Sequence, residues 1–551
     1  MRRFCSHPFG QMALVALLAS AMVFPHLGTP SLWDDDEGVN AECAREMIEA
    51  GNWIVPTFNW ELRTAKPIFL YWLLRFSYAA FGVTEFAARL PSAIAFVITA
   101  VLTYDLARRM FDKGTGLLAG CIALSSLELV KLGRGCTTDA VLIAFTTLYF
   151  WGLYRGTANA GRNWFLPCAA ASALATLTKG PLVGLALILG VVGTWFYWNG
   201  DLRRLRDRRM IRAGLLWGAI AIPWYAFVSA ESHGEWPKEF FLKENLGRST
   251  EPSEAHHGPP IYYLIVICLM FAPWSAFLAV TCWQTWRNCR SAVSEQFRAY
   301  RLLPLWVLVY LAAFSIVATK LPHYIAPAYP PLAILTAAAV VRWMRGEVAW
   351  PRWGVPGAAL GLFATGFLLG TLMLVAGIGE QLGVPKNAMR FFPGLERWAW
   401  IGLFPIFGAA AMIVYHRRGN RPAAIAAFSG STVVFVGLAA AFPPLVMDQY
   451  KAAKELTAQS GARQLDREVV IASLDYSQPS VTFYTQRSVR RLWEASEVND
   501  LLASPIPLYL FVKAGSWGKM EADGKIMQKY RIAARRYDFY RNSVILVITN
   551  R

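Results

Sequence analysis

The sequence predicts a polytopic α-helical membrane protein that carries a small soluble α/β domain after its last span. Its 551 residues are 55% hydrophobic and only 16% charged, whereas soluble domains carry roughly 25% charged residues. Apolar runs of about 20 residues, the length that crosses a bilayer, recur from Met12 onward. After Pro444 these runs stop, and short helical and strand-like patterns alternate.

The apolar runs define about thirteen candidate spans. They cover residues 11–28, 86–107, 114–131, 137–154, 164–180, 182–198, 213–230, 261–284, 302–319, 323–341, 354–376, 398–415 and 422–443. Arg2-Arg3 and the first run together resemble a signal peptide, but no small-residue cleavage site follows. We therefore interpret this run as an uncleaved first span.

The short loops predict the orientation of these spans. If Arg2 and Arg3 lie inside, every other loop must lie inside too, and each of those loops is basic, as the positive-inside rule requires. The inner loops include residues 108–113, 155–162, 203–212, 287–301, 342–352 and 417–421. Topology therefore accounts for the net charge of +18, and we predict no nucleic acid partner.

Polar residues that can do chemistry collect on the opposite, outer side. They include Asp34-Asp35-Asp36, Lys66, residues 131–139, Lys179, the loop 231–260, residues 320–323 and everything after Pro443. No span has a row of ionisable residues at its centre, which counts against a proton-coupled transporter. Runs of charge are most often solvated loops, so a solvated loop is the alternative for the three aspartates.

The first outer loop is too long and too aromatic for an unstructured connection. Residues 41–48 mix charged and apolar side chains at helical spacing, and residues 66–81 are rich in aromatics. Helices of this kind lie in the plane of the membrane interface. We therefore predict two interfacial helices between the first and second spans.

The C-terminal part is expected to be a separate soluble α/β domain, so that residues 1–445 and 446–551 form two domains. The predicted strands are 469–474, 508–512 and 544–548, and the predicted helices are 452–465, 497–503 and 520–528. No phosphate loop, catalytic triad or metal spacing occurs in it. Its expected role is scaffolding or docking of an acceptor.

Metal chemistry is not indicated by the cysteines or histidines. The eight cysteines form no C-x-x-C pair and no spacing with histidine that is typical of a metal site. For His256 and His257 an ordinary loop role is favoured over metal binding. No cofactor is certain, and a divalent metal ion is left open.

One set of motifs resembles the aminoarabinose transferases of lipid A (ArnT-like), within the protein O-mannosyltransferase-like GT-C glycosyltransferases. The motifs are Asp36-Glu37-Gly38, Ala41-Glu42, Arg45-Glu46-Met47, Gly51-Asn52-Trp53, Lys66-Pro67, Tyr71-Trp72-Leu73, residues 88–92, Asp139, residues 178–181, Phe240-Phe241, residues 244–246, Pro273-Trp274 and residues 320–324. The string from Asp36 to Ser92 carries most of the specificity.

The resemblance implies a transferase of about thirteen spans in the bacterial inner membrane, with its active site on the periplasmic side. It implies an undecaprenyl-phosphate-linked sugar as donor, and lipid A or another envelope glycolipid as acceptor, besides membrane lipids. Asp36 would be the catalytic carboxylate, and Asp139 would orient a cation or the acceptor. Phosphate charge on the leaving group needs cations or hydrogen-bond donors. The residues expected to bind donor phosphate or substrate are Lys66 first, then Lys179, Lys320, His323, Tyr324 and Glu37.

Two departures from the family pattern keep other activities open. Val39-Asn40 stand where the family usually has Arg-Tyr, and Ala65 stands where it usually has Glu. The alternatives are transfer of a galacturonosyl or hexosyl unit, a protein O-mannosyltransferase-like enzyme with a polypeptide acceptor, and a flippase or transporter for polyprenyl-linked sugar. For Lys179 and Lys320 the alternative role is that of span-end lysines that reach toward water.

Overall fold

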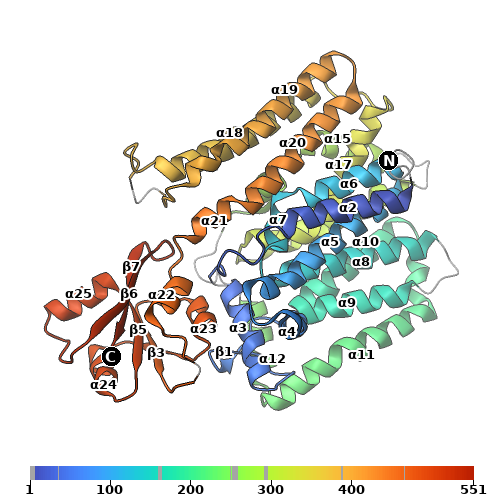
Figure 1. Cartoon of the computed structure of the whole chain (residues 1–551). Coiled ribbons are helices and arrows are strands. Elements are labelled where there is room, and N and C mark those ends of the chain that lie inside the picture. Colours follow the sequence, from blue (N-terminus) through green and yellow to red (C-terminus); the bar gives the residue numbers. More distant parts are fainter. Residues whose placement is uncertain are drawn as a thin grey trace.

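A body of helices joins a five-stranded sheet at one end of the molecule in the computed structural model (Figure 1). The structure describes residues 7–34, 36–158, 164–247, 250, 258–290, 296–385, 389–464 and 466–551. Arg2, Arg3, Asp35, Arg162, His256 and His257, on which some of the predictions rest, lie outside these residues.

Every predicted span overlaps helical structure. The helices are α2 (Pro8–Val23), α5 (Glu85–Met110), α6 (Lys113–Leu124) with α7 (Leu127–Gly133), α8 (Thr138–Ala158), α9 (Phe165–Lys179), η1 (Leu182–Ala186) with α10 (Leu187–Trp198), α11 (Arg208–Glu231), α14 (Tyr262–Met270) with η5 (Trp274–Phe277) and α15 (Leu278–Arg290), α16 (Gln296–Ile316), η6 (Pro322–Ala328) with α17 (Tyr329–Met344), α18 (Gly354–Ile378), η7 (Leu395–Gly402) with α19 (Leu403–Arg417), and α20 (Arg421–Ala441). Shorter connecting helices are η2 (Leu202–Arg206), α12 (Glu235–Lys238) and η3 (Glu239–Gly247).

Length and composition identify a multi-pass membrane protein. Among the described residues, seven helices can cross a membrane by these two criteria, or up to nine if each of two bent pairs is one span. The bent pairs are α6 with α7, at 63°, and α14 with the segment Trp274–Cys289, at 114°. Three further apolar helices are 10–17 residues long. The total of thirteen spans stays a prediction.

Contacts between loops support the predicted orientation. Arg345 at the end of α17 forms an ion pair with Asp112 before α6, at 2.7 Å. Arg298 reaches Asp201 at 3.1 Å, and Arg421 donates to the carbonyl of Trp343 at 2.8 Å. The predicted inner loops therefore lie together in pairs, although each pair is far apart in the sequence.

The first outer loop contains both predicted helices, α3 (Asp36–Glu49) and α4 (Phe69–Phe81), with a short hairpin of β1 (Thr57–Phe58) and β2 (Glu61–Leu62) between them. α3 begins at Asp36, earlier than the predicted residue 41. Asp36 and Glu37 occupy its first turn, where the partial positive charge of a helix N-terminus stabilises carboxylates.

The C-terminal part forms a mixed sheet in the order β4-β3-β5-β7-β6. The strands are β3 (Val470–Leu474), β4 (Val489–Leu492), β5 (Leu508–Lys513), β6 (Arg531–Asp538) and β7 (Ser543–Thr549), and the helices are α21 (Pro443–Asp448), α22 (Ala453–Ser460), α23 (Pro479–Thr485), α24 (Ala495–Ala503) and α25 (Ala514–Ala522). The three predicted strands are confirmed, and the position of the domain boundary after residue 445 stays a prediction.

Two helix predictions in this part need correction. The helix expected at 520–528 is wrong, because α25 ends at Ala522 and Gly524 turns the chain with φ +66°. The helix expected at 452–465 ends at Ser460, because Gly461 adopts φ +70° directly after it. Glycine tolerates this left-handed conformation, which commonly ends a helix.

The sheet domain holds the segment that precedes α3. Tyr484 accepts a hydrogen bond from the Leu32 N–H at 2.8 Å, and Lys451 donates to the Ser31 carbonyl at 2.6 Å. The ammonium of Lys451 also lies over the Trp33 ring, 4.0 Å from its centroid. Figure 1 shows α23 beside α3, and contacts between these two helices continue the interface. We call residues 31–34, held in this way, the clamped segment.

Gly38 marks the closest approach between α3 and α23. A Cβ atom at this position would lie 2.9 Å from the Ser480 amide nitrogen and 3.1 Å from Pro479 Cβ. Overpacking of this kind typically costs about 1–3 kcal/mol. We therefore expect Gly38→Ala to lower the thermal unfolding midpoint of the purified protein and to increase proteolysis between α20 and α22.

The matched control is Gly430→Ala in α20, where an added Cβ meets no atom within 4 Å. Alanine favours helix more than glycine does, so this variant should lose no stability. Equal unfolding midpoints for the two variants would contradict the close packing of α3 on α23.

Candidate active site

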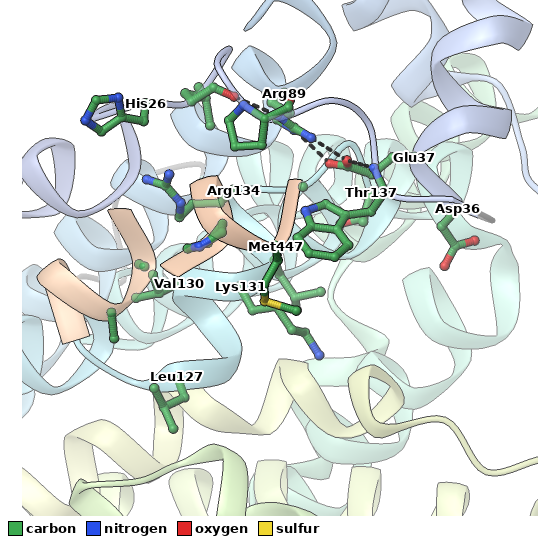
Figure 2. Close-up of a pocket in the computed structure, with 18 of the residues that line it drawn as sticks. His26, Asp36, Glu37, Arg89, Leu127, Val130, Lys131, Arg134, Thr137 and Met447 are labelled. Carbon is green, nitrogen blue, oxygen red and sulfur yellow. Dashed lines mark hydrogen bonds and ion pairs between the residues drawn. The ribbon is translucent and has the colours of Figure 1, made fainter. Parts of the chain in front are cut away.

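Asp36 lies on the wall of a cavity of about 690 Å³ between the clamped segment, α7, α20 and α21. Its side chain is exposed, and Figure 2 shows it directed away from the ion pair of Glu37. Most of the other lining residues are apolar, among them Leu127, Val130 and Val436. The cavity therefore combines lipid-compatible walls with a carboxylate.

The carboxylate of Glu37, next to Asp36, is held by contacts within the protein and is not available to bind a substrate. Arg89 donates two hydrogen bonds to its carboxylate, at 3.0 and 2.7 Å, and the backbone N–H groups of Trp33 and Cys136 donate two more, at 2.8 and 2.7 Å. Burial raises the pKa of Glu37, but Arg89 and the two N–H donors outweigh it and hold the pKa below its ordinary value. Glu37 therefore positions Asp36 by anchoring the first turn of α3.

A second acidic centre lies at the start of α8. Asp139 forms an ion pair with Lys179 at the end of α9, and the Nε2 atom of His323 lies 4.0 Å from the other carboxylate oxygen. The Lys179 ammonium is 5.1 Å from the centroid of the Tyr324 ring. Four predicted site residues from three distant parts of the sequence are therefore neighbours in the fold.

Lys66 and Asp36 belong to the same electrostatic cluster. His323 interacts electrostatically with Asp139, Lys179, Asp36 and Lys66, and Asp139 interacts with Lys66. Lys66, Lys179 and Tyr324 also line a small pocket of about 80 Å³. The cluster therefore contains a carboxylate that faces a large apolar cavity, and two lysines that line a smaller pocket.

Lys320 has a different environment. Its ammonium donates to the carbonyls of Phe314, Ser315 and Val317, at 2.9, 2.6 and 2.6 Å. Burial lowers the pKa of Lys320, but the three carbonyls at the end of α16 accept hydrogen bonds from its ammonium and hold it in place. All three of its N–H donors are used in this structure, so Lys320 supports the wall of the site instead of facing a phosphate.

Comparison with known proteins points in the same direction. Residues 65–227 match the protein family described as dolichyl-phosphate-mannose-protein mannosyltransferase. A solved structure, that of ArnT from Cupriavidus metallidurans bound to undecaprenyl phosphate, superimposes with a TM-score of 0.81 over 98% of this chain and 97% of that chain, at 22% identity. The chain has the fold of ArnT.

Two sequence relatives align with this chain over only part of their own length. An uncharacterized protein of Aquifex aeolicus is 33% identical over 59% of this chain and 62% of its own length. The undecaprenyl phosphate-alpha-4-amino-4-deoxy-L-arabinose arabinosyl transferase of Yersinia enterocolitica is 31% identical over 59% of this chain and 58% of its own length. This chain thus spans about three fifths of the length of these two relatives.

Sequence reasoning missed several residues of the candidate site. Tyr540 lines the large cavity and accepts a hydrogen bond from the Asp34 N–H at 2.9 Å. Nothing in the sequence relates these two positions, which are 506 residues apart. Arg89 lay within the family motif but had no assigned role. Glu128 and Lys131, spaced three apart on α7, were detectable as a potential ion pair.

Metal binding has no evident donor set in the part of the chain that the structure describes. No group of three or more His, Cys, Asp or Glu side chains is placed there to hold a metal ion. Ala65, beside Lys66, offers no ligand atom in its side chain. We therefore derive no catalytic step through a metal.

Proposed function

We propose that this chain is an integral membrane glycosyltransferase that moves one sugar from an undecaprenyl-phosphate donor to a phosphate of lipid A or a related envelope glycolipid. We place it in the bacterial inner membrane with the active site on the periplasmic side. The observation that carries the proposal is that Asp139 pairs with Lys179 and lies 4.0 Å from the Nε2 atom of His323, while Lys179 and Lys66 line one pocket. Asp36, on the wall of the large apolar cavity, interacts electrostatically with His323 of this cluster.

The two cavities suggest how the substrates are divided. The small pocket offers Lys66 and Lys179, which suit the donor phosphate because cations stabilise the charge of a leaving phosphate. The large cavity offers apolar walls and Asp36, which suit the acyl chains and head group of a glycolipid acceptor. The ArnT structure bound to undecaprenyl phosphate and the name of the Yersinia relative support this choice of donor.

The transfer step follows from this placement. An oxygen of the acceptor phosphate attacks the anomeric carbon of the sugar, and a new carbon–oxygen bond forms. The bond from that carbon to the donor phosphate breaks, and its electron pair leaves on undecaprenyl phosphate beside Lys66 and Lys179. Attack opposite the leaving group inverts the anomeric centre. If the acceptor phosphate arrives with a proton on the attacking oxygen, Asp36 accepts it.

Mass spectrometry of lipid A tests the proposal. Matched cells with and without this chain should differ by one sugar increment on lipid A, because the acceptor phosphate receives one glycosyl unit. The mass of the increment distinguishes aminoarabinose from a galacturonosyl or hexosyl unit, which Val39, Asn40 and Ala65 keep as candidates.

Unchanged lipid A would contradict the proposed acceptor. A sugar that stays with the protein fraction would instead support a polypeptide acceptor. Movement of polyprenyl-linked sugar across the membrane without transfer would support a flippase. Cells that express the Asp36→Asn variant serve as the control, because an increment that persists with this variant cannot come from the proposed site.

A further inference from the structure

We propose that Lys131, held in place by the buried carboxylate of Glu128, binds the phosphate of the lipid acceptor in the Asp36 cavity. The inference rests on the proposed function, and it adds a binding residue and a positioning residue to it. The ligand class is a phosphate monoester carried by a lipid.

Glu128 is a fully buried carboxylate within the body of helices. Its side chain in α7 is 0% exposed, and its only ion pair within the described residues is to Lys131, at 2.7 Å. Neither carboxylate oxygen accepts a well-aligned hydrogen bond from the described part of the chain. Burial of an unpaired carboxylate is costly, so Glu128 strongly favours conformations in which the Lys131 ammonium stays beside it.

Lys131 itself reaches the cavity. Its side chain is 53% exposed, and it lines the same cavity as Asp36. In Figure 2 Lys131 extends from α7 into the space that Asp36 also faces. A buried acid therefore holds a cation whose outer part remains accessible to a ligand.

The other lysine and arginine side chains that line this cavity in the described part of the chain already donate hydrogen bonds to the protein. Of the described lysines and arginines that line it, Arg89 donates to Glu37 and to the carbonyls of Leu27, Pro30 and Ser31. Arg134 donates to the carbonyls of Met22, Val23 and Pro25. Only one contact of the Lys131 ammonium, to Glu128, is recorded among the described residues. An ammonium has three N–H donors, so Lys131 keeps donors for a ligand.

Charge indicates what kind of ligand this is. Asp34, Asp36 and Glu37 line the same cavity, so an anionic acceptor needs a nearby cation in order to approach Asp36. Lys131 meets this need, and the apolar residues Leu127 and Val130 on the same helix give the lipid chains a surface. Glu128 also interacts electrostatically with Asp139 and Lys179. It therefore interacts with both the proposed acceptor cation and a proposed donor cation.

Steady-state kinetics of the purified full chain test the inference. The donor is undecaprenyl-phosphate-linked 4-amino-4-deoxy-L-arabinose, and the acceptors are bisphosphorylated lipid A and the same lipid after removal of its phosphates. We expect Lys131→Met to raise the KM for lipid A by at least about tenfold, because a charge-assisted hydrogen bond is lost. The KM for the donor should stay within twofold, and Lys131→Arg should restore most of the acceptor affinity.

Two further variants separate binding from structure. Glu128→Gln should raise the acceptor KM less than Lys131→Met does, and the double variant should be no worse than Lys131→Met alone, because Glu128 acts through Lys131. Lys525→Met is the control, since Lys525 and Asp523 form a comparable ion pair that is exposed on both sides. Inorganic phosphate should compete weakly with lipid A if the phosphate alone is recognised, and it should not compete if the lipid is also required.

The outcomes distinguish the two proposals. Wild-type KM for lipid A in Lys131→Met, or a change confined to the donor KM, overturns the role of Lys131 while the proposed function stands. If the wild type transfers sugar to neither lipid, from this donor or from the corresponding galacturonosyl and hexosyl donors, the proposed function fails. Binding of lipid A to wild type and Lys131→Met, followed by native mass spectrometry, then decides the role of Lys131, because equal binding overturns it.

Discussion

Asp36→Asn should abolish sugar transfer while leaving the protein folded and able to bind donor. The substitution keeps side-chain volume and removes only the charge that would accept a proton or orient the acceptor. Loss of a positioned general base typically lowers the rate by about 100- to 10,000-fold. The measurement is single-turnover transfer from undecaprenyl-phosphate-linked sugar, with donor binding measured separately on the same preparation.

Asp500→Asn provides the comparison for Asp36→Asn. Asp500 lies exposed on α24, among residues that the large cavity does not include. The Asp500→Asn variant should transfer sugar at the wild-type rate. Full activity of Asp36→Asn would refute the catalytic assignment, and loss of donor binding together with activity would show that the variant disturbs the site as a whole.

Arg89→Leu should have the largest effect on stability. The substitution leaves Glu37 buried without its counter-charge, and breaking one side of a buried ion pair costs about 3–5 kcal/mol. The pair is closed to solvent, with side-chain exposures of 2% for Arg89 and 5% for Glu37. We expect a clearly lower thermal unfolding midpoint in detergent, followed by tryptophan fluorescence, and less protein recovered from membranes.

The matched control for Arg89→Leu is Arg345→Leu. Arg345 also forms a two-pronged pair, with Asp112, but both side chains are well exposed, at 47% and 34%. Exposed pairs contribute about 0–1 kcal/mol, so this variant should unfold near the wild-type temperature. Similar midpoints for both arginine variants would show that the Glu37–Arg89 pair does not hold the fold together.

The pH dependence of the stability of the fold gives a second test of the Arg89→Leu prediction. The pKa of Glu37 in the folded chain lies below its ordinary value of 4.5. The pair therefore adds stability that is present above that ordinary value and is lost as pH falls through the lower folded pKa. Wild type should show this loss on acidification, whereas Arg89→Leu should lack it.

Much of the fold follows from patterns that are local in sequence. Spans, interfacial helices and the strands of the sheet domain each depend on hydrophobic runs or alternation within a few residues. Asp36, Lys66, Asp139, Lys179 and His323 could be proposed from motifs, and the structure brings them into one electrostatic cluster. Loop charge also predicted which loops share a side.

The remainder depends on contacts between distant segments, which local patterns do not encode. β4 and β6 are missed because exposed arginines interrupt their apolar pattern, as in Val489–Leu492. The structural use of Lys320 depends on where α16 ends, and that of Glu37 on the reach of Arg89. The clamped segment depends on residues of the sheet domain, so no inspection of residues 31–34 alone could reveal it.

The clamped segment also orders events during biosynthesis. Asp34 accepts a hydrogen bond from the Ser480 N–H and donates one from its own N–H to Tyr540, at sequence separations of 446 and 506 residues. At about 5–20 residues per second, a ribosome needs roughly 25–100 s to add the later partner. A nascent chain therefore contains Asp36 of α3 well before Ser480 and Tyr540, which hold the preceding segment in place, have been synthesised. Asp36 reaches its final position only after the β6–β7 hairpin has been synthesised and has packed against the clamped segment.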